Sequence, residues 1–146
     1  VIIMERFDPQ NYLMLVEKYQ VTHSQLVPTM FSRMLKLPEA VRSAYDVSSL
    51  EVVVHGAAPC PVPVKQQMIE WWGPKWVEYY GGTEGAVISL LSSQDWIDHP
   101  TSVGKPLASV EVHIVDEIDS PGYEVTPPQK TARKTHFDPP MIPFPA

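Results

Sequence analysis

The chain has 146 residues, 44% of them hydrophobic, and a formal net charge of −6 at pH 7. This length favours one domain with one core, because domains of roughly 100–150 residues are the commonest size. The acidic excess opposes binding to nucleic acid or to an anionic membrane. No apolar run approaches the roughly 18 residues of a transmembrane segment, and the single cysteine excludes an internal disulfide and favours a cytoplasmic location.

The first predicted elements are a strand and a helix. The apolar run Val1–Met4 predicts a buried strand. Asp8 and Pro9 then favour a helix start, because Asp8 can accept hydrogen bonds from free backbone N–H groups and Pro9 has no N–H to lose. Tyr12, Val16 and Tyr19 recur at helical spacing, which predicts that this helix continues.

A second strand and a second helix follow. Residues 21–27, "VTHSQLV", have the composition of a strand. Thr29 is predicted to cap the next helix, and Pro38 to end it. We expect a short polar helical turn after that proline.

Four further strands are predicted from residue 50 onward. The β-branched run "LEVVVH" at 50–55 is typical of a strand buried on both faces of a parallel sheet. "KWVEYY" at 75–80 predicts a fourth strand, and "AVISLL" at 86–91 and "VEVHIVD" at 110–116 predict others.

Between the third and fourth strands, the pattern predicts a helix from Val62 to Trp72 with Gly73 as its C-terminal cap. Its buried side is expected to carry Val64, Met68 and Trp71.

Strands that alternate with helices through residues 1–80 predict an α/β fold with a mainly parallel sheet and crossover helices. Ligands of such sheets bind beyond the carboxyl ends of the strands. The segments "GAAP" at 56–59 and "GGTEG" at 81–85 both follow predicted strands, so we expect them at one edge. Residues 1–118 form the predicted domain. The proline-rich tail, residues 119–146, has no periodicity and is expected to be disordered.

The second segment has the residue types of a nucleotide site. Tyr80 offers a flat face for a purine, Gly81 and Gly82 allow backbone N–H groups to approach an oxyanion, Thr83 can donate to a phosphate, and Glu84 can bind Mg²⁺. The alternatives are structural: a tyrosine packed in the core, glycines that only make a tight turn, and a Thr-Glu pair in a solvated turn or helix cap.

Over residues 1–118 the chain resembles the adenylate-forming enzymes, and within them the acyl-CoA synthetases. The resemblance rests on "MERFDP", "VTHSQLVPTMFSRML", "YDVSSLEVVVHGAAPCP", "VKQQMIEWWGPKWVEYYGGTEG" and "TSVGKPLASVEVHIVD". It implies that Tyr80 lies against adenine, that Gly81 and Gly82 line the junction of nucleotide and acyl group, and that Thr83 binds the α-phosphate while Glu84 coordinates Mg²⁺.

The resemblance further implies that Gly56, Ala57, Ala58 and Pro59 face the adenine. By the same resemblance, Val27, Pro28, Thr29 and Phe31 would border an acyl tunnel. The implied reaction joins a fatty or related carboxylic acid to ATP, giving acyl-adenylate and pyrophosphate, and coenzyme A then displaces AMP.

Two further residues near these segments could carry chemistry. Cys60 is interpreted as a small buried hydrophobe, because no partnered base is evident. His55 either faces the ligand or is a structural residue.

Several parts of the family pattern are not found in the sequence: a phosphate loop ending in Pro-Lys-Gly, a Tyr-Arg-Thr-Gly-Asp word, and a C-terminal domain with a catalytic lysine. We therefore expect a piece of the large N-terminal domain, inactive without the remainder of the synthetase and prone to self-association. The alternatives are a piece of an aryl-CoA ligase or of a peptide-synthetase adenylation domain, or a non-catalytic nucleotide-binding remnant.

Overall fold

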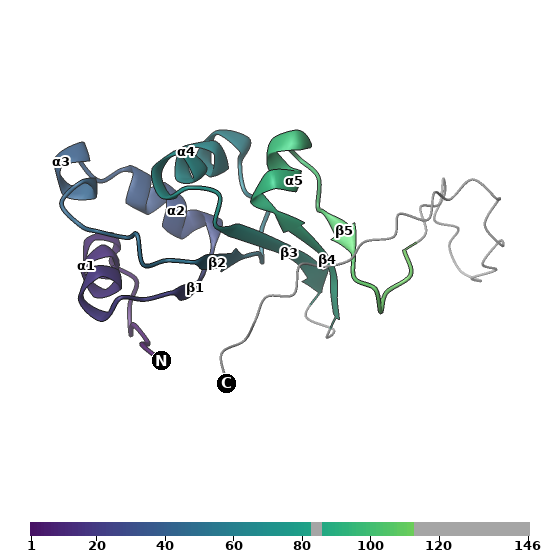
Figure 1. Ribbon diagram of the computed structural model, residues 1–146, viewed down its shortest axis with the longest axis horizontal. Coiled ribbons are helices and arrows are strands. Elements are labelled where there is room, and N and C mark those ends of the chain that lie inside the picture. Colours follow the sequence, from purple (N-terminus) through teal and green to yellow (C-terminus); the bar gives the residue numbers. More distant parts are fainter. Residues whose placement is uncertain (83–85, 113–146) are drawn as a thin grey trace.

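The computed structural model describes residues 1–82 and 86–112 (Figure 1). Its strands form one five-stranded sheet with the order β1-β2-β3-β4-β5. The strands are β1 (His23–Leu26), β2 (Val52–His55), β3 (Trp76–Gly82), β4 (Ala86–Ser92) and β5 (Lys105–Pro106). Strands β1, β2 and β3 are parallel, whereas β4 and β5 are antiparallel to their neighbours. The predicted α/β class and the parallel order of the strands up to residue 80 are confirmed.

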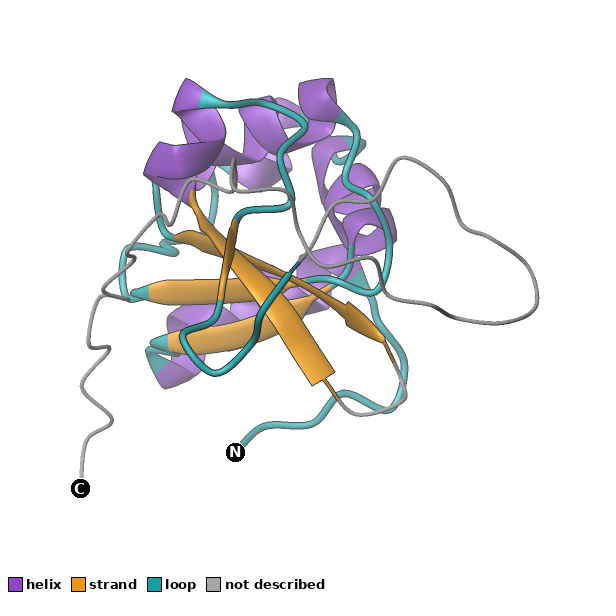
Figure 2. Cartoon of the chain, turned by 90° about the vertical axis from the view of Figure 1, so that its right-hand side faces the viewer, coloured by secondary structure: helices purple, strands orange, loops and turns teal. Residues whose placement is uncertain are grey.

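Five helices accompany the sheet in the described residues. They are α1 (Pro9–Tyr19), α2 (Pro28–Leu35), α3 (Glu39–Arg42), α4 (Val62–Trp72) and α5 (Ser93–Asp98). Helices α2, α4 and α5 lie above the sheet in Figure 1, and α1 lies near β1. The end-on view of Figure 2 shows most of the helical ribbon gathered to one side of the strands.

Local capping chemistry explains where helix α1 begins and ends. Asp8 accepts a hydrogen bond from the backbone N–H of Asn11 at 2.8 Å, and Pro9 occupies the first turn, as predicted. Gln20 has a left-handed backbone conformation, with φ of 49°, and its N–H bonds back to the last turn.

Helix α2 begins one residue before the predicted cap. Val27 is the N-cap and makes no side-chain hydrogen bond, and the helix starts with Pro28. The prediction that Thr29 caps this helix is therefore wrong, because the fixed φ of Pro28 already starts the helical turn.

Helix α4 has the predicted bounds, with Gly73 as its C-cap at φ of 84°. Its buried face differs from the prediction and consists of Lys65, Met68, Ile69 and Trp72. Val64 and Trp71 are only partly buried. The sequence pattern misleads here because a lysine occupies an inward position.

Several elements differ from the prediction at the ends of the described chain. Residues 1–4 form no strand and pair with none of the described strands, and Val1 and Ile3 are exposed. Residues 110–112 form no strand either, and the rest of that predicted strand lies outside the described residues, as does the tail 119–146. Helix α5 was not predicted. Ser92 caps it by accepting from Asp95 N–H.

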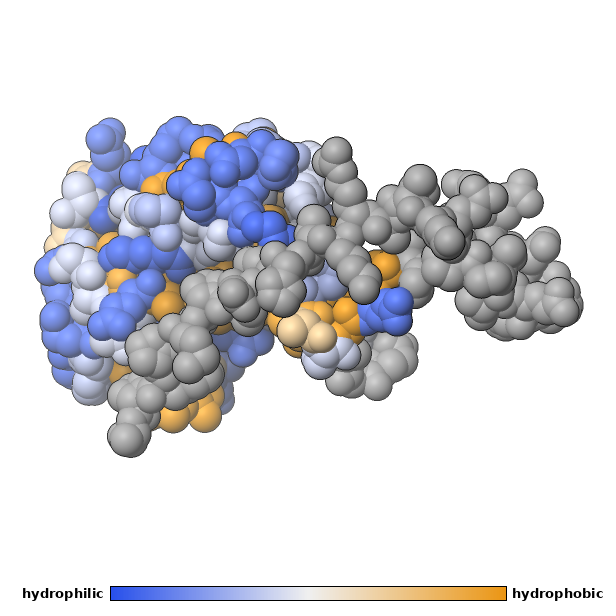
Figure 3. Space-filling model, turned by 45° about the vertical axis from the view of Figure 1, so that its right-hand side comes forward, coloured by the Kyte–Doolittle hydropathy of each residue, from blue (hydrophilic) through white to orange (hydrophobic). Residues whose placement is uncertain are grey.

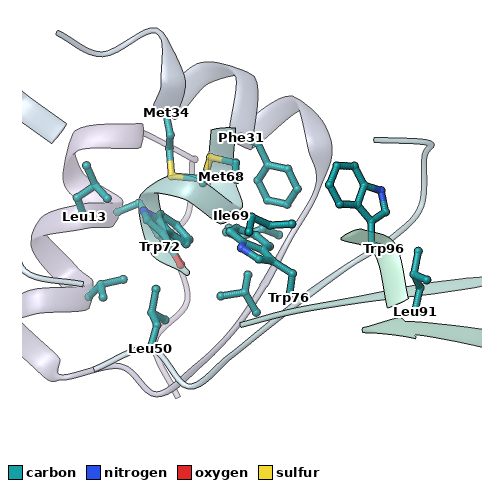
Figure 4. Close-up of a cluster of buried hydrophobic side chains, with 14 residues drawn as sticks. Leu13, Phe31, Met34, Leu50, Met68, Ile69, Trp72, Trp76, Leu91 and Trp96 are labelled. Carbon is teal, nitrogen blue, oxygen red and sulfur yellow. The ribbon is translucent and has the colours of Figure 1, made fainter. Parts of the chain in front are cut away.

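The core lies between the sheet and the helices (Figure 4). Trp72 stacks on Tyr12 and on Trp76, with ring centroids 6.1 and 5.2 Å apart. The buried hydrophobic residues are Tyr12, Leu13, Val16, Leu26, Phe31, Met34, Leu50, Val53, Met68, Ile69, Trp72, Trp76, Leu91 and Trp96.

The two faces of the sheet are covered unequally. Val53, His55 and Trp76 point to the helices and are buried. Successive strand residues point to opposite faces, and the other face carries Val52, Val54, Val77, Tyr79 and Leu90, which are only partly buried. Figure 3 shows mainly hydrophilic residues over the upper, helical part of the molecule, with hydrophobic residues reaching the surface lower down.

Candidate functional site

The two predicted segments follow neighbouring parallel strands of the sheet. His55 lies opposite Glu78 in the pairing of β2 with β3. Strand β2 then ends and the chain enters Gly56–Pro59, whereas β3 continues to Gly82 and pairs there with β4. The carboxyl ends of these two parallel strands therefore meet at one edge, which is where the topology predicts a ligand site.

The two glycines of the second segment are in a strand and not in a loop. Gly81 and Gly82 belong to β3, opposite Val87 and Ala86, and the register shifts between Tyr80 and Gly81. The expectation that they follow the strand is wrong, because pairing with β4 extends β3 beyond the end of β2. Both glycines are exposed.

Gly56 brings the first segment into direct contact with the strand that leads into the second segment. A Cβ atom at this position would lie 2.5, 2.6 and 2.8 Å from three ring atoms of Tyr79. These distances are shorter than van der Waals contact, so only glycine allows the ring to lie where it does. The first turn after β2 and the outer part of β3 consequently pack against each other.

The rest of the first segment is strained and open. Ala57 has φ of 68°, a left-handed conformation that costs a non-glycine residue roughly 1–2 kcal/mol. Ala58 and Pro59 are exposed. Backbone strain of this kind concentrates at functional sites, which makes the loop a candidate for ligand contact.

Tyr80 is 52% exposed, so the alternative of a tyrosine packed in the core does not describe it. The aromatic face is thus open to a planar ligand. Thr83 and Glu84, predicted to bind phosphate and Mg²⁺, lie outside the described residues. Within the described residues, no group of three or more His, Cys, Asp or Glu side chains could hold a metal ion.

Beneath the two segments lies a cluster of ionisable side chains. Lys65 Nζ of α4 donates to Glu78 Oε2 of β3 at 2.5 Å, and His55 Nε2 lies 3.7 Å from the same oxygen. Burial lowers the pKa of Lys65, and the hydrogen bond to Glu78 partly offsets this. Burial and the neighbouring charge of Lys65 lower the pKa of His55 to about 3, so its ring is neutral at pH 7.

His55 does not reach the surface. Its side chain is fully buried, edge-on to Phe31 and Trp76, and neither ring nitrogen has a hydrogen-bond partner among the described residues. This surrounding supports the structural interpretation of His55 over direct contact with a ligand.

Cys60 is partly buried and packs against the core. Burial raises the pKa of its thiol to about 11. A thiol that stays protonated is a poor nucleophile, which agrees with its interpretation as a small hydrophobe.

The predicted acyl wall is divided between core and surface. Pro28 and Phe31 are buried, Val27 is partly buried, and Thr29 is exposed. Phe31 lies edge-on to Trp76 at 4.9 Å between ring centroids. The role of these residues toward an acyl group stays a prediction.

Sequence reasoning did not find Lys65 and Glu78. The available signal was the spacing of Lys65 with Met68, Ile69 and Trp72, which places a lysine on the apolar stripe of α4. A charge at such a position needs a buried partner.

Comparison with known proteins identifies relatives of this chain. The family model for AMP-binding enzyme matches residues 1–126. A medium/long-chain fatty-acid–CoA ligase of Mycobacterium tuberculosis is 32% identical over 83% of the chain and 21% of the relative, and a long-chain fatty-acid–CoA ligase of Bacillus subtilis is 32% identical over 80% of the chain and 20% of the relative.

Solved structures agree with these relatives. The amide bond synthetase of Marinactinospora thermotolerans matches 78% of the chain and 23% of its own length, with a TM-score of 0.71 and 33% identity. The o-succinylbenzoate CoA synthetase of Bacillus subtilis, in complex with its acyl-adenylate intermediate, matches 73% of the chain and 21% of its own length, with a TM-score of 0.58 and 28% identity.

The chain spans about a fifth of the length of the curated relatives it matches. Among its described helices, none is long and apolar enough to cross a membrane. The cytoplasmic location expected from the single cysteine stays a prediction.

Proposed function

The chain belongs to the AMP-binding enzyme family, and from that premise we propose that residues 1–118 are part of the adenylate-binding domain of an acyl-CoA synthetase. The proposed substrates are ATP, a fatty or related carboxylic acid, and coenzyme A. The similarity to two fatty-acid–CoA ligases and to a CoA synthetase bound to an acyl-adenylate supports this choice among the members of the family.

The contact between Gly56 and Tyr79 is the observation that carries the proposal. It packs the first turn after β2, where Ala57 is strained, against Tyr79, and the exposed Tyr80 is the next residue along β3. We propose that adenine binds against Tyr80 and is faced by Gly56–Pro59, and that Gly81 and Gly82 admit the junction of nucleotide and acyl group.

The proposed chemistry needs no protein nucleophile. The substrate carboxylate attacks the α-phosphorus of ATP and pyrophosphate leaves. The thiol of coenzyme A then attacks the acyl carbonyl and AMP leaves. The protein positions the reactants and stabilises the charge that develops on phosphorus, a task we assign to Thr83. Glu84 is the proposed ligand of Mg²⁺, which would supply further positive charge there.

Titration of the ¹⁵N-labelled chain with AMP tests the proposal. We expect the amide resonances of residues 56–58 and 80–84 to shift together, with an affinity no tighter than roughly millimolar, about −4 kcal/mol. Amides of α1 are the internal control. A folded chain in which AMP shifts neither segment would contradict the proposed site.

A second measurement concerns turnover. We expect purified residues 1–146 to form no acyl-CoA from ATP, a fatty acid and coenzyme A, because the phosphate loop and catalytic lysine of the family pattern are not in the sequence. Pyrophosphate release clearly above that of a Glu84→Ala variant would overturn this expectation. A chain that binds AMP and does not turn over fits both the synthetase piece and the non-catalytic remnant.

We also propose that the chain associates with itself through the less covered face of the sheet. Partly buried apolar side chains such as Val52, Val54 and Val77 on one face favour association. Sedimentation at high micromolar concentration should detect dimers or larger species. A monomer that melts cooperatively would contradict this part of the proposal.

A further inference from the structure

Lys65 is buried in a way that needs explanation. Its side chain is 1% exposed, and its ammonium group lies 5.4 Å from the ring centroid of Trp96 and 2.5 Å from Glu78 Oε2. Removing a lysine and a carboxylate from water costs several kcal/mol per ion, and their attraction only roughly offsets that cost. Replacing such a pair by apolar side chains is often neutral or stabilising. A gain in stability therefore does not explain why Lys65 and Glu78 form a buried ion pair.

The position of the pair suggests what it does. Lys65 lies in the helix that follows Gly56–Pro59, and Glu78 lies immediately before Tyr79 and Tyr80 in β3. The ion pair thus joins the helix after one segment of the candidate site to the strand before the other. The pair lies on the helical face of the sheet, level with His55. Tyr79 follows Glu78 and points to the opposite face, so Gly56 contacts Tyr79 on that opposite face.

The geometry also restricts how β3 can move. Glu78 is held by Lys65 from α4, and β3 is held by β2 through the pairing of His55 with Glu78. A shift of β3 along its axis would have to break the 2.5 Å contact as well as the ladder. A hydrogen-bonded ion pair depends on direction and distance, whereas an apolar contact tolerates sliding.

We propose that Lys65 is a positioning residue of the candidate nucleotide site: through Glu78 it fixes Tyr79 against Gly56, and with it the position of Tyr80, the next residue in β3. The inference deepens the proposed function and rests on it. Lys65 itself is buried and touches no ligand, so its effect on binding is indirect.

The test separates position from stability with three variants of the full 146-residue chain. Lys65→Met leaves Glu78 without its cation and is expected to destabilise the fold. Lys65→Met with Glu78→Met removes both charges and is expected to restore stability to about that of the parent chain. Lys65→Arg keeps the cation. The matched control is Lys18→Met, which removes an exposed lysine from α1.

Two readouts are compared. The first is the set of amide resonances of Gly56, Ala57, Tyr79 and Tyr80 without ligand, and the second is the slope of their shifts against AMP concentration. For the double methionine variant we expect displaced resonances in both segments and an AMP affinity lowered by about tenfold. Lys65→Arg should retain most of the affinity, and Lys18→Met should match the parent chain.

Each outcome decides the inference. A folded double variant with parent-like resonances and AMP affinity would overturn it, because the pair would then be only structural. If AMP fails to shift the parent chain, the proposed function fails, and the ligand-free resonances still decide whether Lys65 positions the segments. Should the double variant not fold, Glu78→Gln replaces it, with an expected affinity loss of about threefold; parent-like values in both readouts would equally overturn the inference.

Discussion

The two halves of strand β3 have opposite surroundings. The inner half, Trp76–Glu78, lies between β2 and β4, and Trp76 is 1% exposed. The outer half, Tyr79–Gly82, pairs with β4 and ends in three exposed residues. One strand thus combines two environments: its inner half supports the fold, and its outer half carries the exposed residues that we propose bind the nucleotide. Substitutions on either side of Glu78 should therefore have different effects.

The largest effect is expected in the inner half. Trp76→Ala should lower the free energy of unfolding by about 3–5 kcal/mol, because it removes a buried aromatic side chain and leaves a cavity. The ring packs on Phe31 and Trp72. Urea denaturation followed by far-UV circular dichroism measures the change. A loss below about 1 kcal/mol would mean that the inner half does not support the fold.

The stability of the fold should also depend on pH through His55, the residue of β2 that lies opposite Glu78 in the inner half of β3. The folded ring has a pKa of about 3, whereas the unfolded ring has a pKa near 6.5. Between those values the unfolded chain binds a proton that the folded chain does not, so stability falls as the pH falls, by up to about 1.4 kcal/mol per pH unit.

Denaturation at several pH values tests this effect. His55→Gln should flatten the dependence of the free energy of unfolding on pH between about 3 and 6.5. His23→Gln is the matched control, because it removes an exposed histidine from β1. Equal slopes in the two variants would show that His55 titrates normally in the folded chain.

A substitution at Gly56, which packs on Tyr79 where the two halves of β3 meet, should lower the free energy of unfolding by a smaller amount. Gly56→Ala places a methyl group against the Tyr79 ring, and such overpacking typically costs about 1–3 kcal/mol. Tyr79→Ala in the same chain should restore part of that stability because the ring is gone. A double-mutant cycle measures the coupling between the two positions. Strictly additive losses would argue against the contact.

The smallest effect on stability is expected in the outer half. Tyr80→Ala should change the free energy of unfolding by less than about 0.5 kcal/mol, since its ring is half exposed. The same change should abolish the AMP-induced shifts of residues 56–58. Tyr19→Ala is the matched control, because Tyr19 is 53% exposed and lies on α1. Loss of AMP response in both variants would contradict the role of Tyr80.

Local chemistry made much of the fold predictable. The bounds of α4 and the start of α1 depend on caps, Gly73 and Asp8, that act through the nearest backbone groups. The order of strands β1 to β3 follows from their alternation with helices. Such signals are contained in a few neighbouring residues.

The features that the sequence did not predict depend on contacts between residues distant in sequence. Val1–Met4 has the composition of a strand but finds no described strand to pair with. Gly81 and Gly82 have the composition of a loop, and pairing with β4 makes them part of β3. Lys65 has the charge of a surface residue, and Glu78 allows it to be buried. The candidate site could be predicted as two segments at one edge, whereas the contact that joins them could not.

The change from parallel to antiparallel pairing at β3 has a consequence for the order of folding. Gly82 pairs with Ala86, close by in sequence, whereas β2 reaches β3 only after α4 has crossed the sheet. Local hairpins close within microseconds, and pairings across long stretches of chain form more slowly. The outer half of β3 can therefore acquire its partner strand early, and Gly56 docks onto Tyr79 in the later step that brings β2 alongside.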